Sequence, residues 1–504
     1  MIELDGNSFT LDQLVAIARD AAAVAISGSA QARVRAARAV VDEFAERDTP
    51  TYGINTGFGS FADVKIPHDS LSQLQVNLLR SHAAGVDEPL PVPVVRAAMA
   101  LRANVLAKGY SGIRLETLDL LVELLNRGIH PLVPSRGSVG ASGDLAPLAH
   151  IALVLIGEGS VIAADGIVDG RTALSRARLT PAALGPKEGL ALINGTQPST
   201  ALLGLAVAAA RRLARAADIT AALSIDGLQG SSKPFDARIH AARGSSDQAE
   251  SAANLRGLLD GSGINAAHAN CGRVQDAYSM RCAPQVHGAA RAACRFAHDV
   301  FAAEANAATD NPMVFADTHE IVSGGNFHGA PVSVACDLLC LGMSQLATIS
   351  ERRSDRLVNP ALSGLPAFLT RHGGLHSGLM MAQVTAAALT SELKTLAHPA
   401  SVDTIPTSGN KEDHVSMSMT AALKAARAVA LARRVLAVEL LCACQAIDLL
   451  NPLASSPPLV RVHEFIRARV PVLEDDRPPA PDIDAITQLI ESGELERACA
   501  MNVN

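Results

Sequence analysis

Tyr52 is the first residue whose type and setting could support chemistry. It is one of three tyrosines in 504 residues and lies in the loop 51–59, whose three glycines argue against a stable helix. A phenol acts as a general base only when its pKa falls well below the free value of about 10. Cationic or amide neighbours would have to lower it. A structural tyrosine is the alternative interpretation.

A second irregular segment, 131–143, ends in Ala141-Ser142-Gly143 and leads into an apolar stretch that begins with Asp144 as an expected helix cap. Taken alone, the tripeptide could be a capping loop. The longer run Gly137-Ser-Val-Gly-Ala-Ser-Gly-Asp-Leu-Ala-Pro-Leu-Ala-His150 closely resembles the signature of the aromatic amino acid ammonia-lyase and aminomutase family. In that family the tripeptide cyclises by itself into a methylidene-imidazolone electrophile, which implies that no metal or external cofactor is needed.

The chemistry of the tripeptide is consistent with this resemblance. Gly143 offers an unhindered backbone nitrogen that can attack the Ala141 carbonyl, and glycine tolerates the strained geometry. Loss of water follows, and Ser142 then loses its hydroxyl to leave an exocyclic alkene.

Further motifs extend the resemblance over most of the chain in the order of the family. They lie at residues 52–59, 80–85, 192–197, 275–285, 304–312, 324–328 and 412–417. The resemblance implies an all-α fold with a helix bundle like that of fumarase and aspartase. It also implies a homotetramer whose active sites combine residues from different subunits.

The resemblance also implies roles for individual residues. Tyr52 would remove the substrate β-proton, and Arg281 would bind the amino-acid carboxylate in a bidentate manner. Tyr278 and Asn194 are similar to the family's donors around the electrophile and the carboxylate. The pocket wall would be completed by Gln285 and Phe327.

His82 and Glu412 bear on the choice of substrate. The pair Ser81-His82 and the run around Glu412 resemble the histidine-using members of the family. A carboxylate can accept one imidazole N–H while a neutral histidine meets the other nitrogen. A phenyl ring would leave the buried carboxylate unpaired, at a cost of several kcal/mol. The expected reaction is elimination of ammonia from L-histidine to give trans-urocanate.

Three departures from the histidine pattern leave another substrate open. Lys411 places a positive charge beside Glu412, His376 replaces the more familiar asparagine, and the run 244–248 differs from the usual Gly-Gln ending. The lysine could weaken imidazole binding by pairing with Glu412. It could instead favour a modified histidine such as a thiol-histidine betaine, or it could be an exposed loop residue.

Other functions remain as alternatives. An aminomutase would re-add the ammonia, and another aromatic amino acid could be the substrate. A catalytically inactive scaffold paralogue would keep the fold without forming the electrophile. The run 230–234 resembles the serine loop of the aspartases only faintly, because their following motif is missing.

Composition limits the class of protein. Hydrophobic residues make up 48% of the chain, aromatic residues only 3%, and the net charge is −7. Small aliphatic cores favour packed helices, and an acidic balance argues against nucleic-acid and membrane partners. Eight cysteines form no C-x-x-C pair, so no zinc or disulfide framework is expected. The polar first residues are unlike a targeting peptide, and we expect a soluble, cytoplasmic protein.

Apolar spacing predicts how helices position these residues. Residues 1–200 are expected to form an N-terminal helical domain that carries the electrophile, with short helices, Gly-rich loops and a hairpin at 160–172. Residues 201–504 are expected to form a long-helix bundle with a C-terminal helical extension. The long helices are predicted at 201–223, 285–308, 332–353 and 415–450.

Overall fold

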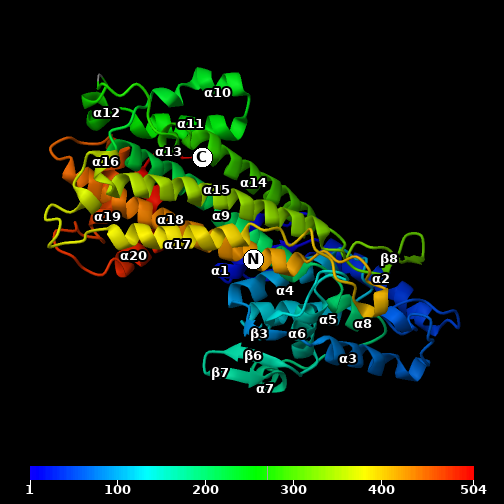
Figure 1. The fold of residues 1–504 in the computed structure, drawn as a ribbon. Helices are drawn as coiled ribbons and strands as arrows, with labels where there is room; N and C mark the ends of the chain where they lie inside the picture. Colours follow the sequence, from blue (N-terminus) through cyan, green and yellow to red (C-terminus); the bar gives the residue numbers. More distant parts are fainter. Residues whose placement is uncertain (270, 504) are drawn as a thin grey trace. The chain divides into compact units, whose positions relative to one another are not determined.

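The computed structural model describes residues 1–269 and 271–503, and most of them are helical (Figure 1). The predicted all-α class is therefore confirmed. The chain divides into two compact units. Unit 1 comprises Met1–Leu205, Ala297–Asp337 and Pro399–Leu423, and unit 2 comprises Ala206–Phe296, Leu338–His398 and Lys424–Asn504.

Unit 1 contains eight of the described helices in full, and they are short to medium in length. They are α1 (Leu11–Arg19), α2 (Gly28–Glu46), α3 (Leu71–His82), α4 (Val92–Ala107), α5 (Leu115–Asn126), α6 (Leu145–Leu155), α7 (Gly170–Arg176) and α8 (Glu188–Ile193). The helix α4 is buried along almost its whole length and packs against α1, α2 and α5. A helix that is buried on every side lies in a core, so α4 is the centre of this unit.

The strands of the described residues all lie in unit 1 and form four small sheets. They are β1 (Ile2–Leu4) with β2 (Val24–Ile26), β3 (Val86–Pro89) with β5 (Pro134–Arg136), β4 (His130–Pro131) with β6 (Ser160–Ala163) and β7 (Gly166–Asp169), and β8 (Met313–Phe315) with β9 (Glu320–Val322). The antiparallel pair β6–β7 is the hairpin predicted from the sequence. The helix α1 ends at Arg19, and Val24 begins the strand β2, which pairs in parallel with β1.

Four long helices were predicted, and the structure confirms each with adjusted ends. They are α9 (Gln197–Gly227), α14 (Ala283–Glu304), α15 (Ala330–Val358) and α18 (Ser418–Leu449). The start of α18 is later than predicted because Met417 has a left-handed φ of +55° and donates its backbone N–H to Val139. This interruption leaves residues 415–417 free to pack elsewhere in unit 1.

The other described helices belong to unit 2. They are α10 (Ala237–Arg243), α11 (Ser246–Leu259), α12 (Gly263–Ala267), α13 (Tyr278–Arg281), α16 (Pro360–Ser363), α17 (Met380–Leu396), α19 (Pro457–Arg467), α20 (Ala480–Ser492) and α21 (Glu494–Cys499). Buried ion pairs accompany the apolar packing there. The Arg353 guanidinium, fully buried, donates to both carboxylate oxygens of Glu439, and Ser224 donates to the same carboxylate.

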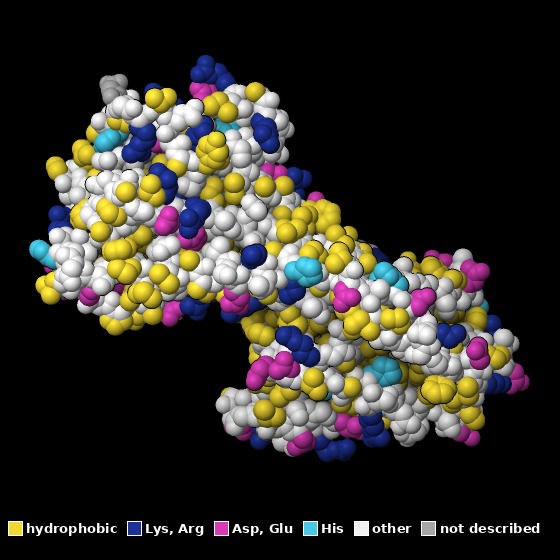
Figure 2. Space-filling view, in the orientation of Figure 1, with side chains coloured by type: hydrophobic (Ala, Val, Ile, Leu, Met, Phe, Trp, Pro, Cys, Tyr) yellow, Lys and Arg dark blue, Asp and Glu magenta, His cyan; other side chains and the backbone are white. Residues whose placement is uncertain are grey.

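Surface charge and the burial of the most apolar long helix concern whether the chain contacts water or a membrane. Lys and Arg side chains are interspersed with Asp and Glu on the face shown in Figure 2. One described helix, α15, is long and apolar enough to cross a membrane by length and composition, but 67% of its most apolar window is buried inside the protein. Helical cores of this kind are common in bundles.

The units do not follow the chain continuously, since unit 1 takes in two segments beyond residue 205. The two domains expected from the sequence, residues 1–200 and 201–504, are continuous segments, and they stay a prediction. The later segments of unit 1 matter for the site, because they carry Phe327, Lys411 and Glu412.

Candidate active site

The Ala141–Gly143 tripeptide lies between β5 and α6 and is held in place by its neighbours. Ala141 is buried against Val415 and Met417. Gly143 has φ +74°, and a Cβ there would lie 2.3 Å from the backbone oxygen of Gly195. Only glycine can therefore occupy position 143, and the backbone at the tripeptide lies directly against residue 195.

Asn194 contacts the tripeptide from the end of α8. Its Nδ2 donates to the Ser142 carbonyl oxygen at 2.8 Å, and the residue is 3% exposed. Beside it, the Asp144 backbone N–H donates to the Gly195 oxygen at 2.8 Å. Two adjacent segments, 142–144 and 194–195, are thus joined by hydrogen bonds on both sides of Gly143.

Asp144 occupies the N-cap position of α6, as expected, but its side chain makes no capping hydrogen bond to that helix. Its side chain accepts from the Ser138 hydroxyl at 2.7 Å and from the Ser199 backbone N–H at 2.8 Å. Burial raises the pKa of Asp144, and these hydrogen bonds oppose the increase. The residue stabilises the first turn of α9 rather than that of α6.

Glu412 approaches the tripeptide from a loop of unit 1. The Ser142 hydroxyl donates to its Oε1 at 2.5 Å, and the Thr407 and Ser408 hydroxyls donate to its Oε2 at 2.5 and 2.8 Å. Burial acts to raise the pKa of Glu412, but these three hydrogen bonds and the nearby His82 outweigh burial and lower it. The carboxylate is therefore ionised and fixed in orientation.

His82 ends α3 with its ring held by the last helical turn. Its Nδ1 lies 2.9 Å from the Leu78 carbonyl oxygen and 3.0 Å from the Ser81 hydroxyl. Because a carbonyl oxygen can only accept, we assign the proton to Nδ1, which leaves a lone pair on Nε2. Burial lowers the pKa of His82, while the Leu78 contact and Glu412 oppose the decrease. The neutral ring is therefore an acceptor at Nε2.

A cavity of about 100 Å³ in unit 1 brings six of the predicted residues together. Its lining comprises Tyr52, Phe58, Gly59, Leu78, His82, Ser142, Leu145, Leu190, Ile193, Asn194, Asn311, Phe327, Ser408 and Glu412. Sequence reasoning did not select Phe58, Asn311 or Ser408. Phe58 and Asn311 lie inside motifs that carry the family resemblance, and Ser408 lies in a polar loop. The sequence therefore indicated these segments but not these individual residues.

The environment of Tyr52 differs from the expected one. Burial and the carboxylates of Glu412 and Asp310 raise its pKa, and only a backbone hydrogen bond with Gly59 opposes them. Its ring packs edge-on against Phe58, with 6.4 Å between centroids. Cationic or amide neighbours would have to lower this pKa; the described lining of the cavity includes the amides Asn194 and Asn311 but no Lys or Arg.

Lys411 and His376 depart from the histidine pattern, and the described lining of this cavity includes neither residue. Lys411 is exposed and is not among the described lining residues, although it precedes Glu412 in the chain. His376 is in unit 2, where its Nδ1 accepts from the Asp476 backbone N–H at 3.3 Å. The Lys411 side chain takes no part in the described hydrogen bonds around Ser142 and Glu412.

Tyr278, Arg281 and Gln285 form a group in unit 2. The Arg281 guanidinium carbon lies 4.6 Å from the centre of the Tyr278 ring, and that ring is 70% exposed. Arg281 and Gln285 line a cavity of about 350 Å³ together with Lys233. Buried Arg281 Nε and Gln285 Oε1 have no hydrogen-bond partner among the described residues, so this group has unused capacity to bind a polar ligand.

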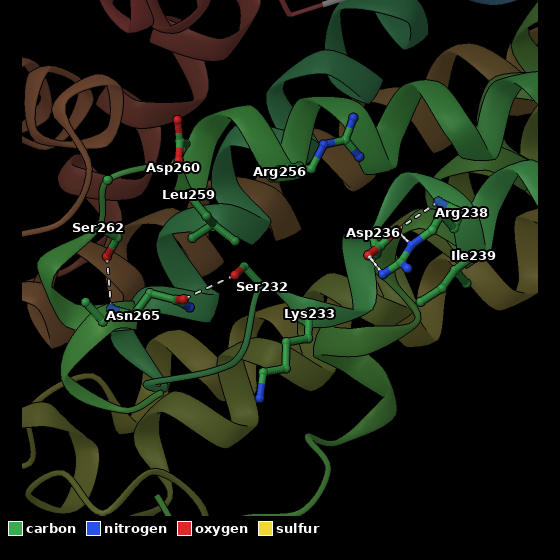
Figure 3. A pocket seen from close by; sticks show the side chains of 12 residues that line it. Ser232, Lys233, Asp236, Arg238, Ile239, Arg256, Leu259, Asp260, Ser262 and Asn265 are labelled. Atoms are coloured by element: carbon green, nitrogen blue, oxygen red, sulfur yellow. Dashed lines mark hydrogen bonds and ion pairs between the residues drawn. The ribbon is translucent and has the colours of Figure 1, made fainter. Parts of the chain in front are cut away.

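A cavity of about 960 Å³ also lies in unit 2 (Figure 3). Its charged lining is already paired in part. Arg238 donates to both oxygens of Asp236, and Arg256 donates to the Phe235 carbonyl oxygen at 2.8 Å. None of the site residues predicted from the sequence is among its described lining residues.

No described cluster of His, Cys, Asp and Glu side chains could hold a metal ion. The residues around Ser142 instead fit an electrophile made from the chain itself. Position 143 accommodates only glycine, Asn194 meets the residue 142 carbonyl, and the Ser142 hydroxyl lies beside a carboxylate.

Comparisons with known proteins agree with this geometry. The family described as aromatic amino acid lyase matches residues 9–468. A histidine ammonia-lyase of Anaeromyxobacter sp. (strain K) is 56% identical over 98% of this chain and 99% of its own. The structure of histidine ammonia-lyase from Trypanosoma cruzi is 45% identical, with a TM-score of 0.92, and the match covers 99% of this chain and 95% of that one.

A structure of tyrosine aminomutase from Streptomyces globisporus is 37% identical, with a TM-score of 0.95 over the whole of both chains. The same fold thus occurs in proteins that are named for different substrates and outcomes. By the extent of these matches, the chain belongs to the aromatic amino acid lyase family, whose members use the methylidene-imidazolone group.

Proposed function

We propose that this carbon–nitrogen lyase removes ammonia from L-histidine and releases trans-urocanate. The observation that carries the proposal is the meeting of His82 and Glu412 with Ser142 in one cavity. Both side chains present acceptors there, and both are held in position by hydrogen bonds from the chain.

The electrophile forms, in this proposal, from Ala141, Ser142 and Gly143 without another component. The Gly143 nitrogen attacks the Ala141 carbonyl, and one water leaves. The Ser142 hydroxyl then leaves as a second water, next to Glu412. Once formed, the methylidene-imidazolone group supplies an electron-poor alkene to the substrate. Asn194 holds the residue 142 carbonyl through its Nδ2.

Recognition of the imidazole rests on the two acceptors. An imidazole ring can donate from a nitrogen to His82 Nε2 or to Glu412, and a protonated ring can donate to both at once. A phenyl ring has no such donor and would cover an ionised carboxylate without pairing it, at a cost of several kcal/mol. The exposed position of Lys411 supports unmodified histidine rather than a thiol-histidine betaine.

Proton removal from the substrate β-carbon is assigned to Tyr52. The groups around it in unit 1 raise its pKa, whereas a base needs a lower one. A cation brought close to the phenol would reverse that direction. Arg281, with Tyr278 and Gln285, would bind the substrate carboxylate. Its positive charge is also the kind that would lower the pKa of Tyr52.

A homotetramer with shared active sites would supply such groups from neighbouring copies. Two observations support this association. Val274 is 95% exposed and Tyr278 is 70% exposed in the segment that carries Arg281. Helix α17 exposes Met381 and Val384, and hydrophobic side chains are visible along it in Figure 2. Exposed apolar surface of this kind is typical of interfaces between subunits. We also propose that the enzyme works in the cytoplasm.

A UV assay of the purified protein tests the function. L-histidine should yield urocanate and an equal amount of ammonia, and L-phenylalanine and L-tyrosine should yield neither cinnamate nor coumarate. Turnover of a thiol-histidine alone would contradict the substrate assignment. A β-amino acid product would show an aminomutase instead. No turnover, with an intact mass equal to that of the unmodified chain, would indicate the inactive paralogue.

A further inference from the structure

Arg102 is a fully buried cation close to the electrophile segment that the proposed mechanism has not used. It lies in α4 and is 1% exposed. Burial lowers its pKa to about 10, although Asp310 opposes the decrease. No carboxylate among the described residues accepts a hydrogen bond from this guanidinium, which is unusual for a buried arginine.

The guanidinium donates only to neutral oxygens of one short segment. Nη1 donates to the Asn194 carbonyl oxygen at 2.9 Å and to Gln197 Oε1 at 2.8 Å, and Nη2 donates to the Ala191 carbonyl oxygen. These groups lie where α8 ends and α9 begins. Carbonyl groups at a helix end have no hydrogen-bond donor within the helix, and Arg102 supplies donors to them.

Two further observations show that the chain is built around this contact. A Cβ at Gly195 would lie 2.5 Å from Arg102 Nη1, so glycine at 195 permits the close approach. Gln197 in turn donates from Nε2 to the Thr309 hydroxyl at 2.8 Å. The position of the segment is therefore set from both sides.

We propose that Arg102 is a positioning residue for the electrophile, which it serves by fixing the backbone from which Asn194 reaches the Ser142 carbonyl oxygen. This inference rests on the proposed function. Asn194 Nδ2 lies 2.8 Å from that oxygen, a distance that a small shift of the segment would lose. A donor at this oxygen withdraws electron density from an alkene conjugated to the carbonyl.

The shape of the guanidinium explains why arginine is needed. Its planar fork can donate to several oxygens at once, whereas a lysine ammonium is a point charge on a flexible stem. A lysine at 102 would keep the charge but not the geometry. The expected defect is therefore in the electrophile rather than in substrate binding.

Arg96 provides a matched control on the same helix. It is 5% exposed, and it donates to the carbonyl oxygens of Ile17 and Leu125 and contacts His130 Nε2. None of these partners lines the cavity of Tyr52 and His82. Arg96→Lys thus creates a similar buried defect in α4 away from the site.

The test compares Arg102→Lys with Arg96→Lys in the full chain. For histidine, Arg102→Lys should lower kcat about 10- to 100-fold with little change in KM, as expected for a lost charge-assisted hydrogen bond. The rate at which an added thiol attaches to chains that are lighter by two waters, followed by intact mass, should fall as well. Arg96→Lys should retain both rates.

Equal rates for the two variants would overturn the proposal for Arg102. If Arg102→Lys does not fold, the variant Thr309→Val is measured in its place. It removes the hydroxyl that accepts from Gln197 Nε2 and leaves Arg102 unchanged. A roughly threefold lower kcat at constant KM supports the proposal, as expected for a weakened neutral hydrogen bond, and an unchanged kcat overturns it. A wild-type chain without the two-water loss or without urocanate production overturns the proposed function instead.

Discussion

The Ser142 hydroxyl donates to Glu412 Oε1 at 2.5 Å, although 270 positions separate the two residues in the chain. The group that must leave to create the electrophile therefore lies against a carboxylate that is also available to an imidazole. After the hydroxyl has left, Glu412 keeps the Thr407 and Ser408 hydroxyls at its other oxygen. One Glu412 oxygen is then free for the substrate.

Glu412→Gln should reduce turnover of histidine strongly. The amide has the same shape but carries no charge, and its NH₂ group cannot accept an N–H. We expect kcat/KM to fall about 100-fold, which corresponds to the loss of a hydrogen bond to a charged group. Urocanate production measured across histidine concentrations tests this. A decrease below threefold would contradict the role assigned to Glu412. Lys411→Gln, a neighbouring exposed change, should alter kcat/KM less than about threefold, as is usual for an exposed charge.

His82→Leu should shift the preference from histidine toward phenylalanine. The change removes the Nε2 acceptor and supplies an apolar wall. The KM for histidine should rise about tenfold, the expected effect of one lost hydrogen bond, and cinnamate should become detectable. Ser81→Ala is the control, because Ser81 contacts Nδ1 of the ring and not the cavity side. Loss of histidine turnover with no gain for phenylalanine would contradict this explanation of specificity.

The pKa of His82 should lie below its usual value of about 6.5 and decrease further in Glu412→Gln. Burial is the main cause of the decrease, and Glu412 opposes it. An NMR titration of the His82 ring measures both values without depending on activity. A higher pKa in Glu412→Gln than in the wild type would contradict the arrangement.

The same shifts determine how acid affects stability. Glu412 has a lowered pKa when folded, so its contribution to stability is present above the unfolded value near 4.3 and is lost as pH falls through the folded value. For His82, the unfolded chain binds protons first, from about pH 6.5 downward, so the folded state loses stability there too. Denaturation midpoints between pH 8 and 5 should therefore decrease less in His82→Leu than in the wild type. Equal pH dependence would contradict the assignment of a buried neutral ring.

Much of the fold could be predicted from residue spacing. Apolar residues three and four positions apart identified the long helices α9, α14, α15 and α18. The start of α18 could not be predicted, because the left-handed φ of Met417 is imposed by packing and by a hydrogen bond to Val139.

The candidate site could be predicted only in part. Motifs identified residues with distinctive chemistry, such as His82 and Glu412. Arg102 was missed because it lies in an ordinary helical pattern, and only the structure places it against residues 191–197. The raised pKa of Tyr52 within unit 1 could not be predicted, since a phenol's pKa depends on neighbours that are distant in sequence.

Ser142→Ala separates electrophile formation from folding. The variant lacks the Ser142 hydroxyl, which also leaves the wild-type chain when the electrophile forms, so it should fold with a Tm within a few degrees of the wild type, roughly what one hydrogen bond contributes. It cannot form the alkene, so urocanate production should disappear. Gly143→Ala should lose activity together with stability, unlike Ser142→Ala, since its Cβ would collide with the Gly195 oxygen and destabilise the local backbone. Residual wild-type activity in Ser142→Ala would contradict the mechanism.

The most direct measurement of the central claim is the intact mass of the purified wild-type chain, followed by the UV assay with L-histidine on the same sample. The purified chain should be lighter by two waters than the mass of its unmodified sequence, and it should release urocanate and ammonia from L-histidine in equal amounts. A chain of unmodified mass, or a lighter chain that releases no urocanate, would contradict that claim.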